Sequence, residues 1–126
     1  MKFYVASSFK NIDQVRYISG KLKRLGNIHT YDWTQNVRAS TLEDLKQIGQ
    51  LEKDAVAEAD LVVVILPGGK GSHIELGIAL GLNKKIILYS PDQSIYNFST
   101  TSTFYHLPEV EKFIGTLDEL VEFLEL

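Results

Sequence analysis

Residues 61–81 read LVVVILPGGKGSHIELGIALG, and this stretch decides the fold. Its first six residues are all leucine, valine or isoleucine, the pattern of a parallel strand that is covered on both faces. A glycine-rich loop follows, and the residues after it predict a helix from about Ser72 to Leu82. A strand, a tight loop and a helix in direct succession form the unit from which parallel α/β sheets are built.

The same alternation continues on both sides of this unit. Apolar runs predict four further strands at 3–7 (FYVAS), 28–33 (IHTYDW), 85–90 (KIILYS) and 110–114 (VEKFI). Helical spacing predicts further helices from near Asn11 to a stop at Gly26, over 41–59 and over 116–126. Alternating strands and helices imply right-handed crossovers. We therefore expect an α/β fold, a three-layer sandwich around a five-stranded parallel sheet of the flavodoxin-like or Rossmann-like kind.

Two details of the helices and one loop refine this prediction. Ser40 with Glu43, and Thr116 with Glu119, are spaced as capping boxes at helix starts. The segment 91–107 is long and rich in serine, threonine and aromatic residues. Loops of that length in compact domains are usually functional or mobile, so we expect this segment to have a role.

The composition of the 126-residue chain narrows the partners that we expect. A hydrophobic fraction of 44% and a charged fraction of 23% are ordinary for one globular domain, which we place at residues 1–126. A net charge of −3 gives no electrostatic reason to expect a nucleic acid polymer or an anionic membrane as partner. No apolar run approaches the roughly 18 residues of a membrane span, the N-terminal residues lack a signal-peptide core, and cysteine is absent. We expect a cytoplasmic protein.

Polar residues gather at the ends of two predicted strands. Ser7, Ser8 and Lys10 follow the strand that contains Tyr4, and the loop 67–72 follows the strand 61–66. In a parallel sheet these ends open on the same edge and are expected to lie beside each other. The loop glycines let backbone amides approach a ligand closely, and the helix start favours an anion; these glycines are Gly68, Gly69 and Gly71. No Lys-Ser/Thr pair closes the loop, so it is not a Walker A loop.

Glu75 lies just behind this loop, on what we expect to be the first turn of the helix. A carboxylate there complements the helix dipole, which is the simplest interpretation. A phosphate-binding loop, however, has no use for a carboxylate that points into its ligand. Chemistry at the anomeric carbon of a sugar does use one, because a carboxylate can attack that carbon or stabilise its oxocarbenium-like charge.

The stretch LPGGKGSHIELGIALGLNKKII resembles the signature of the nucleoside 2-deoxyribosyltransferase family, which includes the 2′-deoxynucleoside 5′-phosphate N-hydrolases. The resemblance continues in YVASSFK near the start, in EADLVVV before the glycine loop and in FYHLPEVEKF near the end. It implies a five-stranded parallel sandwich and a homo-oligomer. It also implies cleavage of the N-glycosidic bond of a nucleoside or nucleotide, with transfer of the sugar to another base or to water.

The resemblance implies a role for individual residues. Glu75 falls on the nucleophile of the family, and Tyr4 on the tyrosine whose hydroxyl holds that carboxylate. Ser8 and Lys10 fall on residues that bind a 5′-phosphate, with lysine in place of the family's arginine. Ser7 and Ser8 also suit a second role, as caps of the helix that begins near Asn11.

The remaining roles are open between alternatives. The acid that protonates the leaving base falls on Glu52 or, in another register, on Asp54. Relatives place a side-chain oxygen near the sugar where this chain has Gly69, so Ser72 or a backbone amide must replace it. Relatives also lend a residue from a neighbouring subunit, for which the candidates are Ser99, Ser102 and Thr103.

Other side chains and other classes of protein also fit the sequence. His73 is a candidate contact to a phosphate or base, or an exposed histidine. Trp33, Phe104 and Tyr105 are candidate stacking partners of a nucleobase, or core residues. PGGKGSHIE also resembles the PGGxGTxxE motif of the "lonely guy" phosphoribohydrolases, which cleave an N-glycosidic bond too. A non-catalytic nucleotide-binding module is the alternative from another class. No metal or redox cofactor is implied, and the expected partner is the nucleoside or nucleotide substrate.

Overall fold

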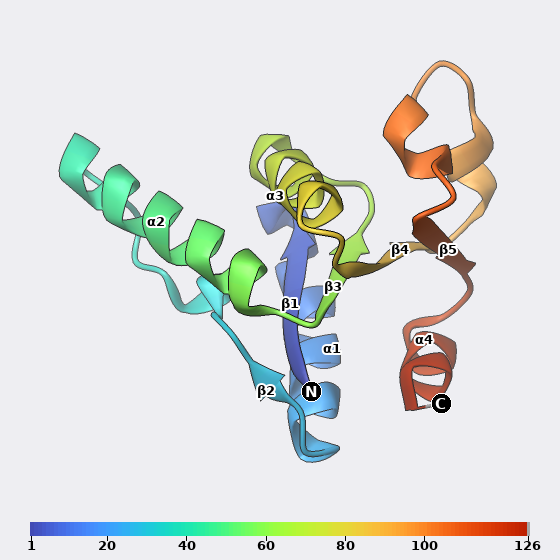
Figure 1. Cartoon of the computed structure of the whole chain (residues 1–126), viewed down its shortest axis with the longest axis horizontal. Helices are drawn as coiled ribbons and strands as arrows, with labels where there is room; N and C mark the ends of the chain where they lie inside the picture. Colours follow the sequence, from blue (N-terminus) through green and yellow to red (C-terminus); the bar gives the residue numbers. More distant parts are fainter. Residues whose placement is uncertain (126) are drawn as a thin grey trace.

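The central feature of the computed structural model, which describes residues 1–125, is a five-stranded parallel sheet with the strand order β2-β1-β3-β4-β5 (Figure 1). The strands are β1 (Lys2–Ser7), β2 (Ile28–His29), β3 (Leu61–Ile65), β4 (Lys85–Ser90) and β5 (Val110–Ile114). Neighbouring strands are parallel throughout. The predicted fold class is confirmed. The strand order reverses between β1 and β3, so the carboxyl ends of these two strands form the switch point of the sheet.

Two pairs of helices cover the sheet. The helices are α1 (Ile12–Arg24), α2 (Leu42–Glu58), α3 (Lys70–Gly81) and α4 (Leu117–Glu125). Helix α2 packs against α3, and α1 packs against α4. Figure 1 shows α3 in front of the sheet and α1 behind it. The three layers follow from right-handed crossovers between parallel strands.

The core lies along the three central strands. Every residue of β3 is buried, which explains why that strand reads as an unbroken apolar run. The middle of β1, residues 3–6, is fully buried as well. The helices supply apolar residues at spacings of three and four, such as Val15, Ile18 and Leu22 of α1. Gly26, with a φ of 91°, ends α1 as predicted, because glycine adopts that conformation without strain.

The second strand is shorter than predicted. The expected strand 28–33 keeps only Ile28–His29, and a 3-10 helix η2 (Trp33–Gln35) follows. The carboxylate of Asp32 caps η2 by accepting from the Thr34 amide at 3.0 Å. The indole nitrogen of Trp33 donates to the Val5 carbonyl at 2.7 Å. Capping and this tertiary hydrogen bond turn the chain back onto β1, so the pairing of β2 ends early.

The helix starts differ in part from the prediction. The predicted box of Ser40 and Glu43 is wrong by one residue, since Thr41 Oγ1 accepts from the Asp44 amide at 3.0 Å and Asp44 accepts from the Ser40 amide at 3.1 Å. The second box is confirmed. Thr116 Oγ1 accepts from the Glu119 amide at 3.1 Å, and Glu119 accepts from the Thr116 amide at 2.9 Å.

The remaining differences lie in the loops and at the end of the chain. Helix α3 begins two residues earlier than predicted, at Lys70. The segment 91–107 contains two short 3-10 helices, η3 (Gln93–Tyr96) and η4 (Thr103–His106), and a further one, η1 (Phe9–Asn11), precedes α1. The predicted last residue of the C-terminal helix, 126, lies outside the described residues. Among residues 1–125, no helix is long and apolar enough to span a membrane.

Candidate active site

A tyrosine and two glutamates from three different elements meet beside the sheet. The Tyr4 hydroxyl, on β1, donates to Glu75 Oε2 on α3 at 2.5 Å. Glu52 Oε2, on α2, lies 3.5 Å from the same hydroxyl. Tyr4 is fully buried, Glu75 is 7% exposed and Glu52 is half-buried. We call these three residues the Tyr4 cluster.

The position of Glu75 on α3 brings it to this cluster. The residues of α3 that face the core recur at helical spacing and are Ser72, Glu75, Leu76 and Ala79. Glu75 is therefore a carboxyl group on the buried face of a helix, in its second turn and not in the first turn as predicted. A helix-dipole role is strongest in the first turn of an exposed helix end, so this position argues against it. A buried carboxyl needs a polar partner, and Tyr4 supplies it.

Burial dominates the electrostatics of the cluster. It raises the pKa of Glu75 well above its usual range; the nearby Glu52 carboxylate raises the pKa further, and the hydrogen bond from Tyr4 opposes both effects. Burial also raises the pKa of Glu52, against hydrogen bonding with Glu75 and Tyr4. Burial and the two carboxylates raise the pKa of Tyr4, so its hydroxyl remains a donor at all ordinary pH values. Two close carboxyl groups of this kind titrate as a pair.

The alternative acid, Asp54, does not lie in the cluster. It is exposed, and its carboxylate accepts a hydrogen bond from Gln50 Nε2 at 2.8 Å. Residues 52 and 54 are two positions apart on α2 and leave different faces of the helix. Of the two registers left open by the sequence, the geometry therefore favours Glu52.

The ends of β1 and β3 are tied together by Asn11. Its side-chain amide donates to Ser7 Oγ at 3.0 Å and to the Pro67 carbonyl at 2.8 Å. Ser7 Oγ in turn donates to the Ile65 carbonyl at 2.8 Å. The hydroxyl of Ser7, a predicted substrate contact, is thus engaged within the protein. Sequence reasoning missed the role of Asn11, because an asparagine before a helix ordinarily indicates only a cap.

Ser8 and Lys10 lie beside the glycine loop. Ser8 caps the 3-10 helix η1 by accepting from the Lys10 amide at 3.2 Å. The predicted cap of the helix near Asn11 by Ser7 or Ser8 is wrong, because Asn11 holds the N-cap position of α1 without a side-chain hydrogen bond. A Cβ added at Gly69 would lie 3.8 Å from Ser8 Cβ, so the two loops meet here. Lys10 is exposed, and no ion pair engages its ammonium group within residues 1–125. These positions agree with the predicted neighbourhood of the two strand ends.

The glycine loop is held by the first turn of α3. Ser72 Oγ accepts from the Gly69 amide at 2.7 Å and lies 2.9 Å from the Gly69 carbonyl oxygen. Ser72 is 2% exposed, so its hydroxyl shapes the loop. The sequence had predicted that this hydroxyl faces the ligand, and it does not. A Cβ at Gly68 would lie 2.6 Å from Ser72 Oγ, so any larger residue there would displace the hydroxyl that holds the loop. At Gly71 a Cβ would meet no atom within 4 Å, so the loop is open on that side.

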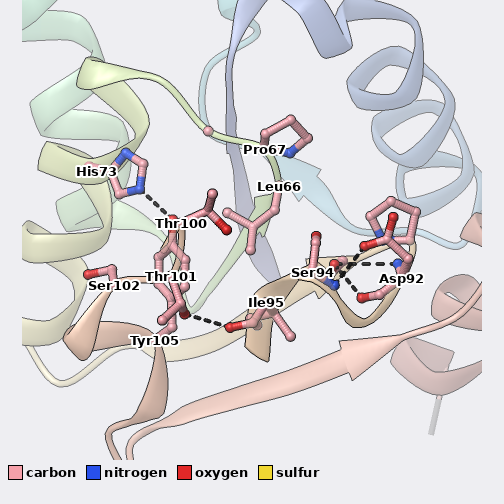
Figure 2. A pocket seen from close by; sticks show the side chains of 13 residues that line it. Leu66, Pro67, His73, Asp92, Ser94, Ile95, Thr100, Thr101, Ser102 and Tyr105 are labelled. Atoms are coloured by element: carbon pink, nitrogen blue, oxygen red, sulfur yellow. Dashed lines mark hydrogen bonds between the residues drawn. The ribbon is translucent and has the colours of Figure 1, made fainter. Parts of the chain in front are cut away.

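His73 and Ser102 lie in a different place from Glu75. His73 leaves α3 two residues before Glu75 and hence from another face. Together with the end of β4 and the segment after it, these two residues line a hollow of about 430 Å³ (Figure 2), which we call the β4 hollow. Ser102 Oγ caps η4 by accepting from the Phe104 amide at 3.3 Å. Within one chain, these two predicted substrate contacts are therefore not brought to the Tyr4 cluster.

A second hollow, of about 520 Å³, adjoins the cluster. We call it the Trp33 hollow; its lining is largely apolar and consists of Phe9, Trp33, Asn36, Val37, Arg38, Ala39, Leu45, Ile48 and Glu52. Phe9 contacts Trp33 edge to face, with ring centroids 5.2 Å apart. Glu52 belongs to both the hollow and the cluster. Sequence reasoning missed Phe9, although an aromatic residue directly after the first strand was the available signal.

The cluster places two carboxyl groups and a phenol beside a largely apolar hollow. A buried carboxylate that accepts a hydrogen bond from a phenol is suited to attack an electrophilic carbon. A second carboxyl group beside it, when protonated, is suited to general acid catalysis. Within the described part of the chain, no three histidine, cysteine or acidic side chains gather as a metal site.

Comparisons with known proteins agree with the fold. The model of the nucleoside 2-deoxyribosyltransferase family matches residues 3–117. A CMP N-glycosidase from Clostridium botulinum has the same fold, with a TM-score of 0.67, 20% identity and 100% coverage of both chains. A 2-deoxyribosyltransferase from Bacillus psychrosaccharolyticus has a TM-score of 0.63 and 19% identity, over 96% of this chain and 90% of that one.

A conserved protein from Enterococcus faecalis V583 is similar as well, with a TM-score of 0.69 and 17% identity over 99% of this chain and 97% of that one. A comparison with curated protein sequences finds no match. At these identities the solved structures support the fold, and the family rests on the match over residues 3–117.

Proposed function

Because this chain belongs to the nucleoside 2-deoxyribosyltransferase family, we propose that it cleaves the N-glycosidic bond of nucleosides or their 5′-monophosphates, with Glu75 as nucleophile. We further propose the 5′-monophosphate as the preferred form and water as the final acceptor of the sugar. The observation that carries the proposal is the Tyr4 cluster, in which a buried carboxylate is held at 2.5 Å by a phenol beside a second carboxyl group.

The first step exchanges the C1′–N bond for a C1′–O bond. The Glu75 carboxylate attacks C1′ from the face opposite the base, the bonding electrons leave with the nucleobase, and the base takes a proton from Glu52. The shared titration of the two buried carboxyl groups supports this division, because one proton between them leaves one nucleophile and one acid. Burial raises the pKa of both carboxyl groups, and the Tyr4 hydroxyl opposes this in both. The hydroxyl lies 2.5 Å from Glu75 and 3.5 Å from Glu52, and this shorter hydrogen bond supports Glu75 as the ionised member.

The second step restores the enzyme. Water attacks C1′ from the side that the base has left, gives a proton to the ionised Glu52, and breaks the bond between C1′ and Glu75. Two inversions leave the sugar with its original configuration. A second nucleobase that takes the place of water makes the same site a transferase, which is one outcome of the experiment below.

The Trp33 hollow is our proposed nucleobase site. It borders Glu52, the proposed acid, and its apolar lining suits a planar ring. Phe9 lines this hollow and is 66% exposed, so its ring is accessible for stacking on a base.

The loops around Ser8 and Gly69 are our proposed 5′-phosphate site. The start of α3 offers backbone amides to an anion, and Lys10 offers an ammonium group without an ion-pair partner among residues 1–125. A free nucleoside gives Lys10 nothing to pair with. This lysine is the feature that favours the monophosphate over the nucleoside.

We also propose that the protein is a homo-oligomer. Phe98, in the segment 91–107, is 97% exposed. Asn97 fixes the turn at this point by accepting from the amide and hydroxyl of Ser99. Ile74 and Phe104 are also more than half exposed. Apolar side chains held out in this way are typical of surfaces that contact another chain. Light scattering is expected to give more than one chain per particle, and an active monomer would contradict this.

Product analysis tests the proposed reaction. Purified protein is incubated with deoxynucleosides, ribonucleosides and their 5′-monophosphates, with and without a second nucleobase, and the bases are separated by chromatography; Glu75→Gln is the control. Free base from monophosphates is the expected result. A new nucleoside formed only with the second base would make the protein a transferase. Preference for ribose monophosphates would agree with the substrate of the similar CMP N-glycosidase as well as with the phosphoribohydrolase alternative. No release above the control would leave a non-catalytic binding module.

A further inference from the structure

The imidazole of His73 joins two parts of the chain. Its Nδ1 lies 2.7 Å from the Gly69 carbonyl oxygen, and its Nε2 lies 2.5 Å from the hydroxyl of Tyr105. A carbonyl oxygen can only accept, so Nδ1 carries the hydrogen; in a neutral ring Nε2 then accepts from Tyr105. The two rings also stack, with centroids 5.8 Å apart and planes 18° apart. Figure 2 shows His73 reaching from α3 towards the segment that carries Tyr105.

The contact between His73 and Tyr105 lies between two hollows. On one side of His73 lies the β4 hollow, and on the other lies a smaller hollow of about 220 Å³ between α3 and Phe104. The segment packs mainly on the sheet, with η3 on β4 and η4 on β5. The hydrogen bond between His73 and Tyr105, together with the stacking of their rings, joins this segment to the first turn of α3.

The link ends on the peptide that shapes the glycine loop. Gly69 precedes α3, and its carbonyl oxygen is approached by Ser72 Oγ at 2.9 Å and by the His73 amide at 3.2 Å, in addition to His73 Nδ1. A trans peptide is planar, so a carbonyl held towards the helix directs the amide of Lys70 the opposite way, out of the helix start. That is the direction from which an anion approaches.

We propose that His73 and Tyr105 are positioning residues that fix the Gly69–Lys70 peptide and couple the segment 93–106 to the glycine loop. The proposal rests on the proposed function in one respect, namely that the loop binds the phosphate end of the substrate. His73 does not contact substrate in this account, because both ring nitrogens are engaged within the protein.

The first test needs no activity. In protein labelled with ¹⁵N-histidine, His73 at a pH where it is neutral is expected to be the Nδ1–H tautomer, with its signal assigned by its loss in His73→Asn. Tyr105→Phe keeps the aromatic stack and removes the hydroxyl, so the amide signals of Lys70 and Gly71 are expected to shift. Tyr17→Phe is the matched control, since it removes a phenol that bonds Asp118 between α1 and α4. An Nε2–H tautomer, or unchanged Lys70 and Gly71 signals in Tyr105→Phe, would overturn the proposal.

The second test uses kinetics. Tyr105→Phe and His73→Asn are each expected to raise KM for the monophosphate by about three- to tenfold and to change kcat by less than about twofold, because binding is weakened and the reacting groups are untouched. Tyr17→Phe should change neither constant. A fall in kcat at constant KM would overturn the assignment to the loop. If the wild type releases no base at all, the proposed function fails, and the tautomer and the amide shifts still decide the positioning role.

Discussion

Phe3 and Tyr4 are neighbours on β1 whose side chains leave opposite faces of the sheet, and each meets a titratable residue there. On one face the Tyr4 hydroxyl bonds Glu75, and Glu52 completes a partnered cluster. On the other face the Phe3 ring stacks on His29, with ring centroids 4.6 Å apart, and both ring nitrogens of His29 are buried without a hydrogen-bond partner among residues 1–125. The face of Tyr4 thus holds its buried polar groups in a defined geometry, as catalysis requires. The face of Phe3 holds a buried histidine whose unpaired nitrogens only lower the stability of the fold.

The largest effect is expected from Glu75→Gln. Base release should fall by at least about 10³-fold, because the attacking oxygen is lost. The pKa of Glu75 is higher in the folded state than in the unfolded state. Its contribution to the free energy of unfolding is therefore complete below the unfolded-state pKa and is lost as pH rises through the folded-state pKa. The amide escapes this loss, so the variant should be more stable at neutral pH by about 1–2 kcal/mol.

Chromatography of released base and urea unfolding measure the two effects. Tyr4→Phe, which removes a hydrogen bond and not the nucleophile, should be impaired less than Glu75→Gln. A folded Glu75→Gln protein that keeps wild-type turnover would contradict the proposal that the Tyr4 cluster is the active site.

The pH profile of kcat/KM sharpens the roles of the two glutamates. One must be ionised and the other protonated, so the profile should be bell-shaped, and both limbs should lie above the ordinary range of carboxyl groups because burial raises both pKa values. Glu52→Gln should lower kcat about 100-fold and abolish the alkaline limb, since the proton donor is gone. Asp54→Asn, two residues away and exposed, is the matched control. Loss of the alkaline limb in Asp54→Asn would reverse the assignment.

A smaller effect is expected at the edge of the site. Lys10→Ala should raise KM for the 5′-monophosphate about tenfold, equivalent to ~1.4 kcal/mol, and leave KM for the nucleoside unchanged, because only the phosphate pairs with the ammonium group. Steady-state kinetics on both substrate forms measure this difference, with Lys53→Ala as a control on the exposed side of α2. Equal kcat/KM values of the wild type for the two forms would refute the phosphate site.

The smallest effect belongs to the other face of β1. Burial lowers the pKa of His29, so the unfolded chain binds this proton more readily; stability should fall as pH drops from above the ordinary histidine pKa through the folded-state value. His29→Phe removes both unpartnered nitrogens and this acid slope, and should stabilise the fold by about 1 kcal/mol with activity unchanged. Unfolding at pH 5 and pH 8 measures it. A loss of activity at full stability would show that the two faces are not separate in function.

Local pattern was sufficient to predict most of the fold. The strands at 85–90 and 110–114 have the predicted bounds, and the box of Thr116 and Glu119 forms as spaced, because each depends on neighbours in sequence. The turn at Trp33 was not predictable, since its indole bonds the Val5 carbonyl across the sheet edge. Periodicity cannot detect a tertiary hydrogen bond of that kind.

The candidate site divides in the same way. The resemblance placed Glu75, Tyr4 and Glu52, and the structure brings these three together. Ser7, Ser72 and His73 carry groups that suit a ligand, yet each bonds a backbone group or a side chain of another residue in the chain. Residue type alone cannot distinguish a group that faces a ligand from one that shapes the loop beside it, because the direction of a side chain depends on the packed structure.

The measurement that tests the central claim most directly is the trapping of the sugar on Glu75. A 2′-fluoro-2′-deoxynucleoside 5′-monophosphate destabilises the oxocarbenium-like transition states, so a covalent intermediate breaks down slowly once formed. Mass spectrometry of the intact protein is expected to show the added sugar phosphate, and peptide mapping should place it on Glu75, with no adduct in Glu75→Gln. An adduct on another residue, or base release without an adduct in an equally active protein, would contradict the account.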